Sequence, residues 1–337
     1  MIERKNYNLL RHNTFGIDAC CHAFVEYASV EEAREVAERL KDDAALLILG
    51  GGSNLLLTGD FHGTVVHSAI KGWTEEMLPD GNVLLRVGSG ETWDDVVALC
   101  VANGWHGAEN LSLIPGEVGA SAVQNIGAYG AEVADMIEKV EAVDLQNGQI
   151  CEFTAVDCQY GYRQSRFKHE WKNRFLITYV TYRLSTTYNP LLDYGNIRAE
   201  LERLGINNPT AAEVREVIID IRRRKLPDPA VEGNAGSFFM NPVVSRELFE
   251  QLLADYPQMP HYFVDDTHEK IPAGWLIDQC GWKGRSLGCA GVHSRQALVL
   301  VNRGGAKGED IVRLSDAIRQ DVKARFNIDI HPEVNII

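Results

Sequence analysis

The chain has 337 residues, enough for two or three domains, and its 45% hydrophobic and 24% charged residues exclude a largely disordered protein. Its formal net charge of -14 at pH 7 argues against a protein that tracks a nucleic-acid backbone, because such binding needs clustered Lys and Arg. The same acidic field does not attract phosphates, so a phosphate-bearing ligand needs local binding features.

The N-terminal region and the cysteines indicate a reduced, cytoplasmic environment. Residues 1–10 lack the apolar core of a signal peptide, and no stretch approaches the roughly 20 apolar residues of a membrane span. The seven cysteines are odd in number and form no CxxC pair. Cys20, Cys21 and His22 are adjacent, a poor arrangement for one metal ion, so we expect a strand edge with small buried thiols and no metal.

Two helices are predicted in the N-terminal third. Residues 28–43 are amphipathic, and Ser29 with Glu32 is typical of a capping box. A second helix is predicted after the strand at 82–87, with Thr92 as its cap and Asp95 three residues later.

Short apolar or β-branched runs predict the strands. They are residues 44–49, 55–57, 82–87, 140–145, 176–184, 297–302 and 334–337. Because strands and helices mix without a strict alternation, an α+β fold is favoured over a doubly wound sheet.

The C-terminal half begins with a composition change. Residues 186–210 are rich in Pro, Asn and Gly and show little periodicity. Thr210 and Glu213 then cap a helix that ends in the cations 222–225, before a Leu-Pro-Asp-Pro stop. Further helices are predicted at 246–255, 272–281 and 309–326.

Residues 50–54, Gly-Gly-Gly-Ser-Asn, follow one predicted strand and precede another. They form neither a GxGxxG fingerprint nor a P-loop, because no helix and no Lys-Ser/Thr pair follows. Two interpretations stay open: a strand–loop–strand nest that binds an anion through backbone N–H groups, and a tight hairpin turn.

Residues 114–130, IPGEVGASAVQNIGAYG, form a second glycine-rich segment. Small residues allow a backbone to approach another backbone or a flat ligand closely, and long loops in compact domains are usually functional. Ser121, Gln124 and Asn125 can donate hydrogen bonds without adding charge. Two segments rich in Gly, Ser and Asn in an acidic protein favour a phosphate-bearing cofactor, with a simple surface loop as the alternative.

The two segments together resemble the FAD-binding signature of the UDP-N-acetylenolpyruvoylglucosamine reductase (MurB) family, which belongs to the flavin superfamily that includes vanillyl-alcohol oxidase. The resemblance continues in family order along nearly the whole chain. The further matching motifs are NTFG at 13–16, YGYR at 160–163, KLPDP at 225–229, GNAGSFF at 233–239, AGWLIDQ at 273–279 and HPEV at 331–334.

This resemblance implies an α+β fold with a two-lobed FAD-binding domain of the vanillyl-alcohol-oxidase (PCMH) type and a smaller α+β substrate-binding domain. The implied divisions are residues 1–190 for the FAD-binding domain, split near residue 70, 191–225 for a tyrosine loop and connecting helix, 226–330 for the substrate-binding domain, and 331–337 for a tail that returns to the active site.

The family reaction is NADPH-dependent reduction of UDP-N-acetylglucosamine enolpyruvate to UDP-N-acetylmuramate through FAD, in peptidoglycan precursor synthesis. The resemblance implies that Ser237 donates the proton, that Arg163 stabilises the enolate and carboxylate, and that Glu333 assists as an acid. Taken singly, each residue has a more common explanation: a turn for Ser237, a surface ion pair for Arg163 and a frayed tail for Glu333.

The resemblance also assigns binding residues. Those implied for FAD, held without a covalent bond, are Gly50, Gly51, Gly52, Ser53, Asn54, Ile114, Pro115, Gly116, Ser121, Gln124, Asn125, Gly127 and Ala128. Those implied for the substrate, with the tyrosine loop of the type I form, are Tyr194, Lys225, Asn241 and Gln296. Lys225 is explained equally well as a cation at a helix C-terminus.

Other functions remain as alternatives: an FAD-dependent sugar or alcohol oxidase of the same superfamily, a non-catalytic flavin or nucleotide sensor, and a structural α+β protein whose glycine segments are only turns. We expect a monomer whose partners are small molecules, with no nucleic-acid or membrane partner.

Overall fold

The computed structural model describes residues 1–41, 43 and 45–337, which form two compact units. The first unit comprises residues 1–7, 21–51 and 62–224, and the second comprises residues 8–20, 52–61 and 225–337. The end of the predicted helix at residue 42 and the start of the predicted strand at residue 44 lie outside the described residues. The domain divisions given above remain a prediction.

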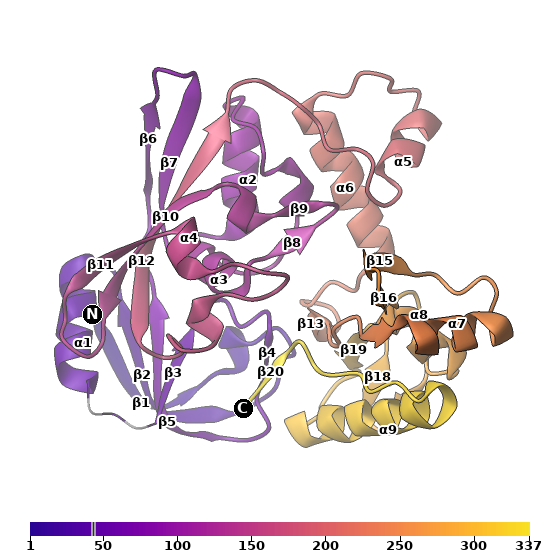
Figure 1. Ribbon diagram of the computed structural model, residues 1–337. Coiled ribbons are helices and arrows are strands. Elements are labelled where there is room, and N and C mark those ends of the chain that lie inside the picture. Colours follow the sequence, from indigo (N-terminus) through magenta and orange to yellow (C-terminus); the bar gives the residue numbers. More distant parts are fainter. Residues whose placement is uncertain (42, 44) are drawn as a thin grey trace. The chain divides into compact units, whose positions relative to one another are not determined.

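One sheet of the first unit gathers strands from the N-terminal third of the chain (Figure 1). Its strands are β1 (Ile2–Asn8), β2 (Cys20–Tyr27), β3 (Leu46–Leu49) and β5 (Phe61–Ser68), in the order β1-β2-β5-β3. Helix α1 (Val30–Leu40) contributes Ala33, Val36 and Ala37 to the same buried cluster as Val66. The Ser29 hydroxyl accepts from the Glu32 N–H at 3.1 Å, so the expected N-terminal cap is confirmed.

A larger antiparallel sheet forms the other lobe of the first unit, in the order β11-β10-β12-β7-β6. Its strands are β6 (Trp73–Met77), β7 (Asn82–Gly88), β10 (Ile137–Asp144), β11 (Ile150–Thr154) and β12 (Phe175–Ser185). Its core includes α2 (Trp93–Ala102) and α3 (Val118–Gln124), and the ring of Trp93 packs edge-on against Tyr182 at 5.6 Å. Two further short strands, β8 (Gly127–Ala128) and β9 (Ala131–Glu132), pair with each other, and a one-turn helix, α4 (Ala155–Cys158), follows β11.

Two helices complete the first unit: α5 (Ile197–Arg203) and α6 (Ala211–Lys225). Helix α6 has the predicted capping box, because Thr210 and Glu213 exchange hydrogen bonds with each other's backbone N–H groups. Arg215 pairs with Asp94 at 2.7 Å and thereby ties α6 to α2. Part of the segment 186–210 is therefore helical, contrary to its irregular composition, because Ile197 and Leu201 pack against α6.

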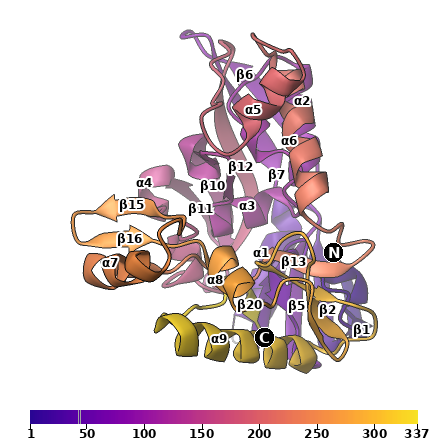
Figure 2. The same ribbon diagram turned by 90° about the vertical axis from the view of Figure 1, so that its right-hand side faces the viewer.

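The second unit contains two small antiparallel sheets and three helices. The strands are β13 (Gly233–Ser237), β14 (Val243–Ser245), β15 (Tyr262–Asp265), β16 (His268–Lys270), β17 (Ser286–Leu287), β18 (Ala290–Val292) and β19 (Val299–Asn302). The helices are α7 (Arg246–Asp255), α8 (Ala273–Gln279) and α9 (Gly308–Phe326). Helix α9 lies along β18 and β19 of the sheet ordered β13-β19-β18-β17 (Figure 1), and α8 packs on the same helix (Figure 2).

The C-terminal strand β20 (Asn335–Ile336) pairs in parallel with β4 (Leu55–Leu56), 280 residues earlier in the chain. Strand β3, in contrast, pairs with β5. The strands on either side of residues 50–54 are therefore not paired with each other, which excludes the hairpin interpretation of this segment.

Three local features differ in detail from the sequence expectations. Thr92 occupies the predicted N-cap position of α2, but its side chain makes no capping hydrogen bond, and the residue forms a bridge with Glu117. The alternative interpretation of the second glycine-rich segment as a simple surface loop is excluded, because the segment contains α3. The strand predicted at 297–302 is present and begins at Val299.

The cysteines are all free thiols, and Cys21 is buried in β2, as expected for a strand edge. In the described ranges, none of the helices combines the length and the apolar character needed to cross a bilayer.

Candidate cofactor-binding and active site

The two glycine-rich segments meet within the first unit. A Cβ built on Gly51 would lie 3.3 Å from the Cα of Gly116, and one built on Gly50 would lie 2.9 Å from the Cβ of Ala120. Such contacts leave no room for a side chain, so glycine is required where β3 ends. The sequence predicted two ligand-binding segments, and the structure places them in direct contact.

The rest of the first glycine turn belongs to the second unit. Gly52 has a φ of +63°, and a Cβ there would lie 2.0 Å from the carbonyl oxygen of His12. Asn54 accepts from the Asn335 N–H at 3.2 Å and directs its own amide toward the Glu333 carbonyl at 3.5 Å. Ser53 lies between them and is partly buried. Gly52 is thus held against the backbone of His12, and Asn54 against the C-terminal segment.

Unusual backbone conformations gather in the second glycine-rich segment. Leu113, Asn125 and Tyr129 have φ values of +57°, +48° and +49°, and Gly116 has a φ of +125°. Non-glycine residues in this region cost of order 1–3 kcal/mol each and cluster at ligand sites. Ile114 and Pro115, between two of these positions, are not fully buried. The backbone conformation fits a segment shaped for a ligand.

Two of the expected side-chain donors are used inside the protein. The Ser121 hydroxyl, 2% exposed, donates to the Val118 carbonyl at 2.7 Å. The Asn125 amide donates to Glu132 and to the Gly161 carbonyl, both at 2.8 Å, and accepts from the Ala134 N–H. These bonds shape the segment. The sequence did not reveal them, and FAD binding by Ser121, Gln124, Asn125 and Ala128 remains a prediction.

Arg163 lies directly on this segment. It has a φ of +58°, and its guanidinium donates to the carbonyl of Asn125 at 3.2 Å and to that of Gly127. A Cβ on Gly127 would lie 2.8 Å from Nη1 of Arg163, so the absence of a side chain at Gly127 admits the guanidinium. The guanidinium of Arg163 is therefore engaged with backbone carbonyls of the second glycine-rich segment, and its catalytic role remains a prediction.

The sequence analysis missed a second arginine at this place. Arg222 of α6 donates to the Leu113 carbonyl at 3.3 Å. Burial lowers the pKa of Arg222 against the opposing effects of Tyr129 and Asp94, and the charge of Arg163 adds to the lowering. Burial likewise raises the pKa of Tyr129, while Arg222 opposes that change. The sequence analysis interpreted the cationic run 222–225 only as the end of a helix. Arg222 lies three residues before Lys225, and therefore on the same helix face, which was the signal that could have identified it.

The loop that carries Tyr194 lies against the end of the same segment. The Asn110 amide donates to the carbonyls of Tyr129 and Leu191, both at 2.9 Å. A Cβ on Gly130 would lie 3.2 Å from the Cβ of Tyr194, a residue that is 51% exposed. Within the first unit, Tyr194 and Arg163 thus lie on the second glycine-rich segment, which also contacts Gly50 and Gly51.

Ser237 and Glu333 lie together in the second unit. Ser237 is exposed, whereas the next two residues, Phe238 and Phe239, are buried. The Glu333 N–H donates to the Phe238 carbonyl at 2.8 Å, and Pro332 forms a bridge with Phe239. The tail is therefore docked as a strand and not frayed.

The remaining predicted substrate residues also belong to the second unit. Asn241 accepts from the Ala273 N–H at 2.9 Å, and Gln296 accepts from the Leu298 N–H at 3.2 Å. Lys225 is exposed at the end of α6. The carbonyl oxygens of Asn241 and Gln296 are thus engaged in the protein, and the roles of all three residues remain predictions.

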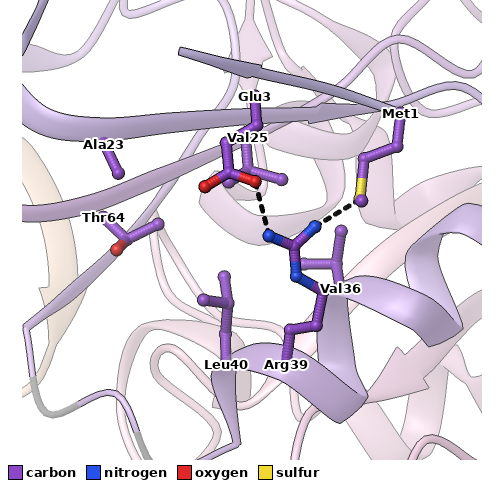
Figure 3. Close-up of a pocket in the computed structure, with 8 residues that line it drawn as sticks. All are labelled: Met1, Glu3, Ala23, Val25, Val36, Arg39, Leu40 and Thr64. Carbon is purple, nitrogen blue, oxygen red and sulfur yellow. Dashed lines mark hydrogen bonds and ion pairs between the residues drawn. The ribbon is translucent and has the colours of Figure 1, made fainter. Parts of the chain in front are cut away.

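A surface hollow elsewhere in the first unit is lined by β1, β2, β5 and α1 and contains the ion pair between Arg39 and Glu3 (Figure 3). The residues that line it include none of the predicted site residues. Among the described residues there is also no group of three or more His, Cys, Asp or Glu side chains arranged to hold a metal ion.

Comparison with known proteins identifies two domains. Residues 21–154 match an FAD binding domain, and residues 228–337 match the UDP-N-acetylenolpyruvoylglucosamine reductase C-terminal domain. The crystal structure of UDP-N-acetylenolpyruvylglucosamine reductase (MurB) from Thermus caldophilus has the same fold, with a TM-score of 0.67, 23% identity and coverage of 99% of this chain and 98% of that chain. The expected α+β fold with an FAD-binding domain is confirmed.

Curated relatives extend the match to the whole chain. UDP-N-acetylenolpyruvoylglucosamine reductase from Bacteroides fragilis is 56% identical over 334 residues, covering 99% of both chains. The enzyme of that name from Porphyromonas gingivalis is 48% identical over 335 residues, again covering 99% of both. The resemblance inferred from the sequence motifs is thereby confirmed, and this chain belongs to the UDP-N-acetylenolpyruvoylglucosamine reductase family.

Proposed function

We propose that this protein uses non-covalently bound FAD to catalyse the NADPH-dependent reduction of UDP-N-acetylglucosamine enolpyruvate to UDP-N-acetylmuramate, in the cytoplasm and as a monomer. The observation that carries the proposal is the placement of Arg163 on the second glycine-rich segment, where its guanidinium fills the space that Gly127 leaves. The relatives that are 56% and 48% identical over 99% of this chain are named UDP-N-acetylenolpyruvoylglucosamine reductase, which supports the substrate and the reductase activity in this proposal.

The residues of the first unit fit a flat, phosphate-bearing ligand. Gly50 and Gly51 present backbone without side chains beside Gly116. Backbone N–H groups arranged in such a turn can bind an anion without a cationic side chain. FAD held by these residues would supply the hydride transfer that links NADPH to the terminal carbon of the enolpyruvyl ether.

Three side chains serve the second step in this proposal. Arg163, permanently charged, stabilises the substrate carboxylate and the negative charge that develops on it as the hydride arrives. The hydroxyl of Ser237 gives its proton to the adjacent carbon, which completes the reduction of the double bond. Glu333, held beside Phe238 by its backbone, supports that proton transfer.

Rapid mixing under anaerobic conditions, with the visible absorbance of the flavin as readout, tests the proposal. NADPH should bleach the flavin, and the enolpyruvyl substrate should restore its colour. Restoration by oxygen alone, with no response to NADPH, would instead indicate an oxidase. Gel filtration tests the expected monomer.

The role of Ser237 is separable in the same experiment. Ser237→Ala should leave bleaching by NADPH nearly unchanged and slow the return of colour by roughly 10²-fold or more, the range for loss of a general acid. Ser286→Ala, at an equally exposed serine of the second unit, is the matched control and should behave as the unmodified protein. An equal loss in both steps would show that Ser237 acts only structurally.

A further inference from the structure

A largely buried histidine lies between two carboxylates beneath the glycine-rich segments. In His67 of β5, Nδ1 lies 2.9 Å from Oε2 of Glu26, and Nε2 lies 3.1 Å from Oε1 of Glu117. The side chains of His67, Glu26 and Glu117 are 12%, 25% and 19% exposed. All three belong to the first unit.

The number of protons on the ring decides how many of these contacts are hydrogen bonds. A neutral imidazole carries one N–H, so it can donate to only one of the two carboxylates; an imidazolium donates to both. Burial by itself lowers the pKa of His67, but Glu117 and Glu26 outweigh it, and the pKa lies above its usual 6.5. The ring also stacks on Phe24, with centroids 6.1 Å apart.

Two further residues near His67, Leu49 and Tyr27, carry no charge at neutral pH. From β3, the residue paired with His67 is Leu49. From β2, besides Glu26, the nearby Tyr27 donates its hydroxyl to the Ile177 carbonyl, and burial raises its pKa. The trio therefore carries one net negative charge while His67 is protonated and two when it is not.

Glu117 connects this trio to the candidate cofactor site. Its Cγ lies 3.7 Å from a Cβ built on Gly51, and its Oε2 lies 3.5 Å from one built on Gly50. Its carbonyl accepts from the Ser121 N–H, in the first turn of α3. His67 itself is paired in register with Leu49, one residue before Gly50. One side chain, Glu117, thus contacts the first segment while belonging to the second.

We propose that protonated His67 is a positioning residue for cofactor binding, which holds and neutralises Glu117 so that both glycine-rich segments can accept the anionic diphosphate of a dinucleotide. The proposal rests on the proposed function, because it presumes that FAD binds at these segments. A second negative charge beside the diphosphate, in a partly buried place, disfavours binding. The acidic chain as a whole offers no compensation.

The direction of the pH dependence follows from the raised pKa. The contribution of His67 is complete below pH 6.5 and is lost as the pH rises through its higher pKa in the folded protein. FAD should therefore bind more weakly in alkaline solution. By linkage, FAD binding should also take up protons at a pH near that pKa.

The test is the dissociation constant of FAD, measured by quenching of its fluorescence across a pH series from about 6 to about 9. The unmodified protein should lose roughly tenfold in affinity over this range, the equivalent of one pKa unit of coupling. His67→Gln should bind FAD more weakly at low pH and show no such dependence. Glu117→Gln should bind at least as tightly as the unmodified protein at high pH.

His62→Gln is the matched control, because His62 lies on the same strand and is exposed. It should reproduce the unmodified pH profile. A His67→Gln protein that keeps this profile would overturn the proposal. If His67→Gln does not fold, Glu117→Gln serves as the test. The proposal is then overturned if the FAD affinity of Glu117→Gln depends on pH as it does in the unmodified protein.

The ring of His67 can also be titrated by NMR in the protein without FAD, and a midpoint at or below 6.5 would contradict the inference. A protein that binds no FAD even at low pH would instead refute the proposed function, so the two failures are distinguishable.

Discussion

The backbone N–H of Glu333 donates to the carbonyl of Phe238 at 2.8 Å, which places the end of the chain beside the residue that follows Ser237. The strand pairing of Asn335 with Leu55 continues this attachment. The segments that carry Ser237 and Glu333, 96 positions apart in the sequence, are thereby neighbours within one unit. The strands at or next to these residues, β13 and β20, are no longer than five residues.

Glu333 is expected to act on the chemical step and not on cofactor binding. Glu333→Gln should slow reoxidation of the flavin by the enolpyruvyl substrate by roughly 10²-fold, because an acid is removed near the developing charge. The flavin content should not change. Glu250→Gln, at an exposed position on α7, is the control. Loss of flavin in Glu333→Gln would indicate a structural role.

Gly50 should tolerate no side chain. In Gly50→Ala the new Cβ would meet the Cβ of Ala120 at 2.9 Å, so the two glycine-rich segments must separate. We expect a loss of about 1–3 kcal/mol in the free energy of unfolding and a weaker affinity for FAD. Gly59→Ala has nothing within 4 Å and is the control. Equal FAD affinity in the two variants would show that the contact between the segments is irrelevant to binding.

Ser121 tests whether its hydroxyl serves the fold or the cofactor. Ser121→Ala leaves the Val118 carbonyl without this donor and should lower the free energy of unfolding by about 1 kcal/mol. Chemical denaturation without FAD measures this loss. If the hydroxyl instead binds FAD, the stability without FAD should be unchanged and the dissociation constant should rise.

Asp94 should make the first unit sensitive to acid. Burial raises its pKa, but hydrogen bonds from Arg215 and the Leu113 N–H outweigh burial and hold the pKa below its usual 3.8. Because the pKa of Asp94 is lower in the folded protein, its ionised form stabilises the fold above pH 3.8. This stabilisation is lost as the pH falls through the lower pKa of the folded protein.

The difference in thermal midpoint between Asp94→Asn and the unmodified protein should therefore be largest near neutral pH and shrink in acid. Asp95→Asn, exposed one position along the same helix, should show no such difference. A constant difference at every pH would exclude the ion pair with Arg215 as its cause.

The sequence alone determined what depends on neighbouring residues. The cap of α1 at Ser29, the box of Thr210 and Glu213, and the helices at 246–255 and 309–326 follow from local hydrogen bonding and amphipathic spacing. The motifs and their order along the chain were likewise sufficient to recognise the family, because comparing motifs requires no knowledge of contacts in the folded protein.

Tertiary structure decided what depends on residues far apart. The pairing of β4 with β20 could not be predicted, because the two apolar residues of β4 do not indicate which strand, here 280 positions away, they pair with. The bonds from the Ser121 hydroxyl to the Val118 carbonyl and from the Asn125 amide to the Gly161 carbonyl were likewise visible only in the folded chain.

The same reason hid the contacts of Arg222 with Leu113 and of His67 with Glu26 and Glu117. Each joins strands, helices and turns separated by tens of residues, and only the folded chain brings their charges close enough to interact.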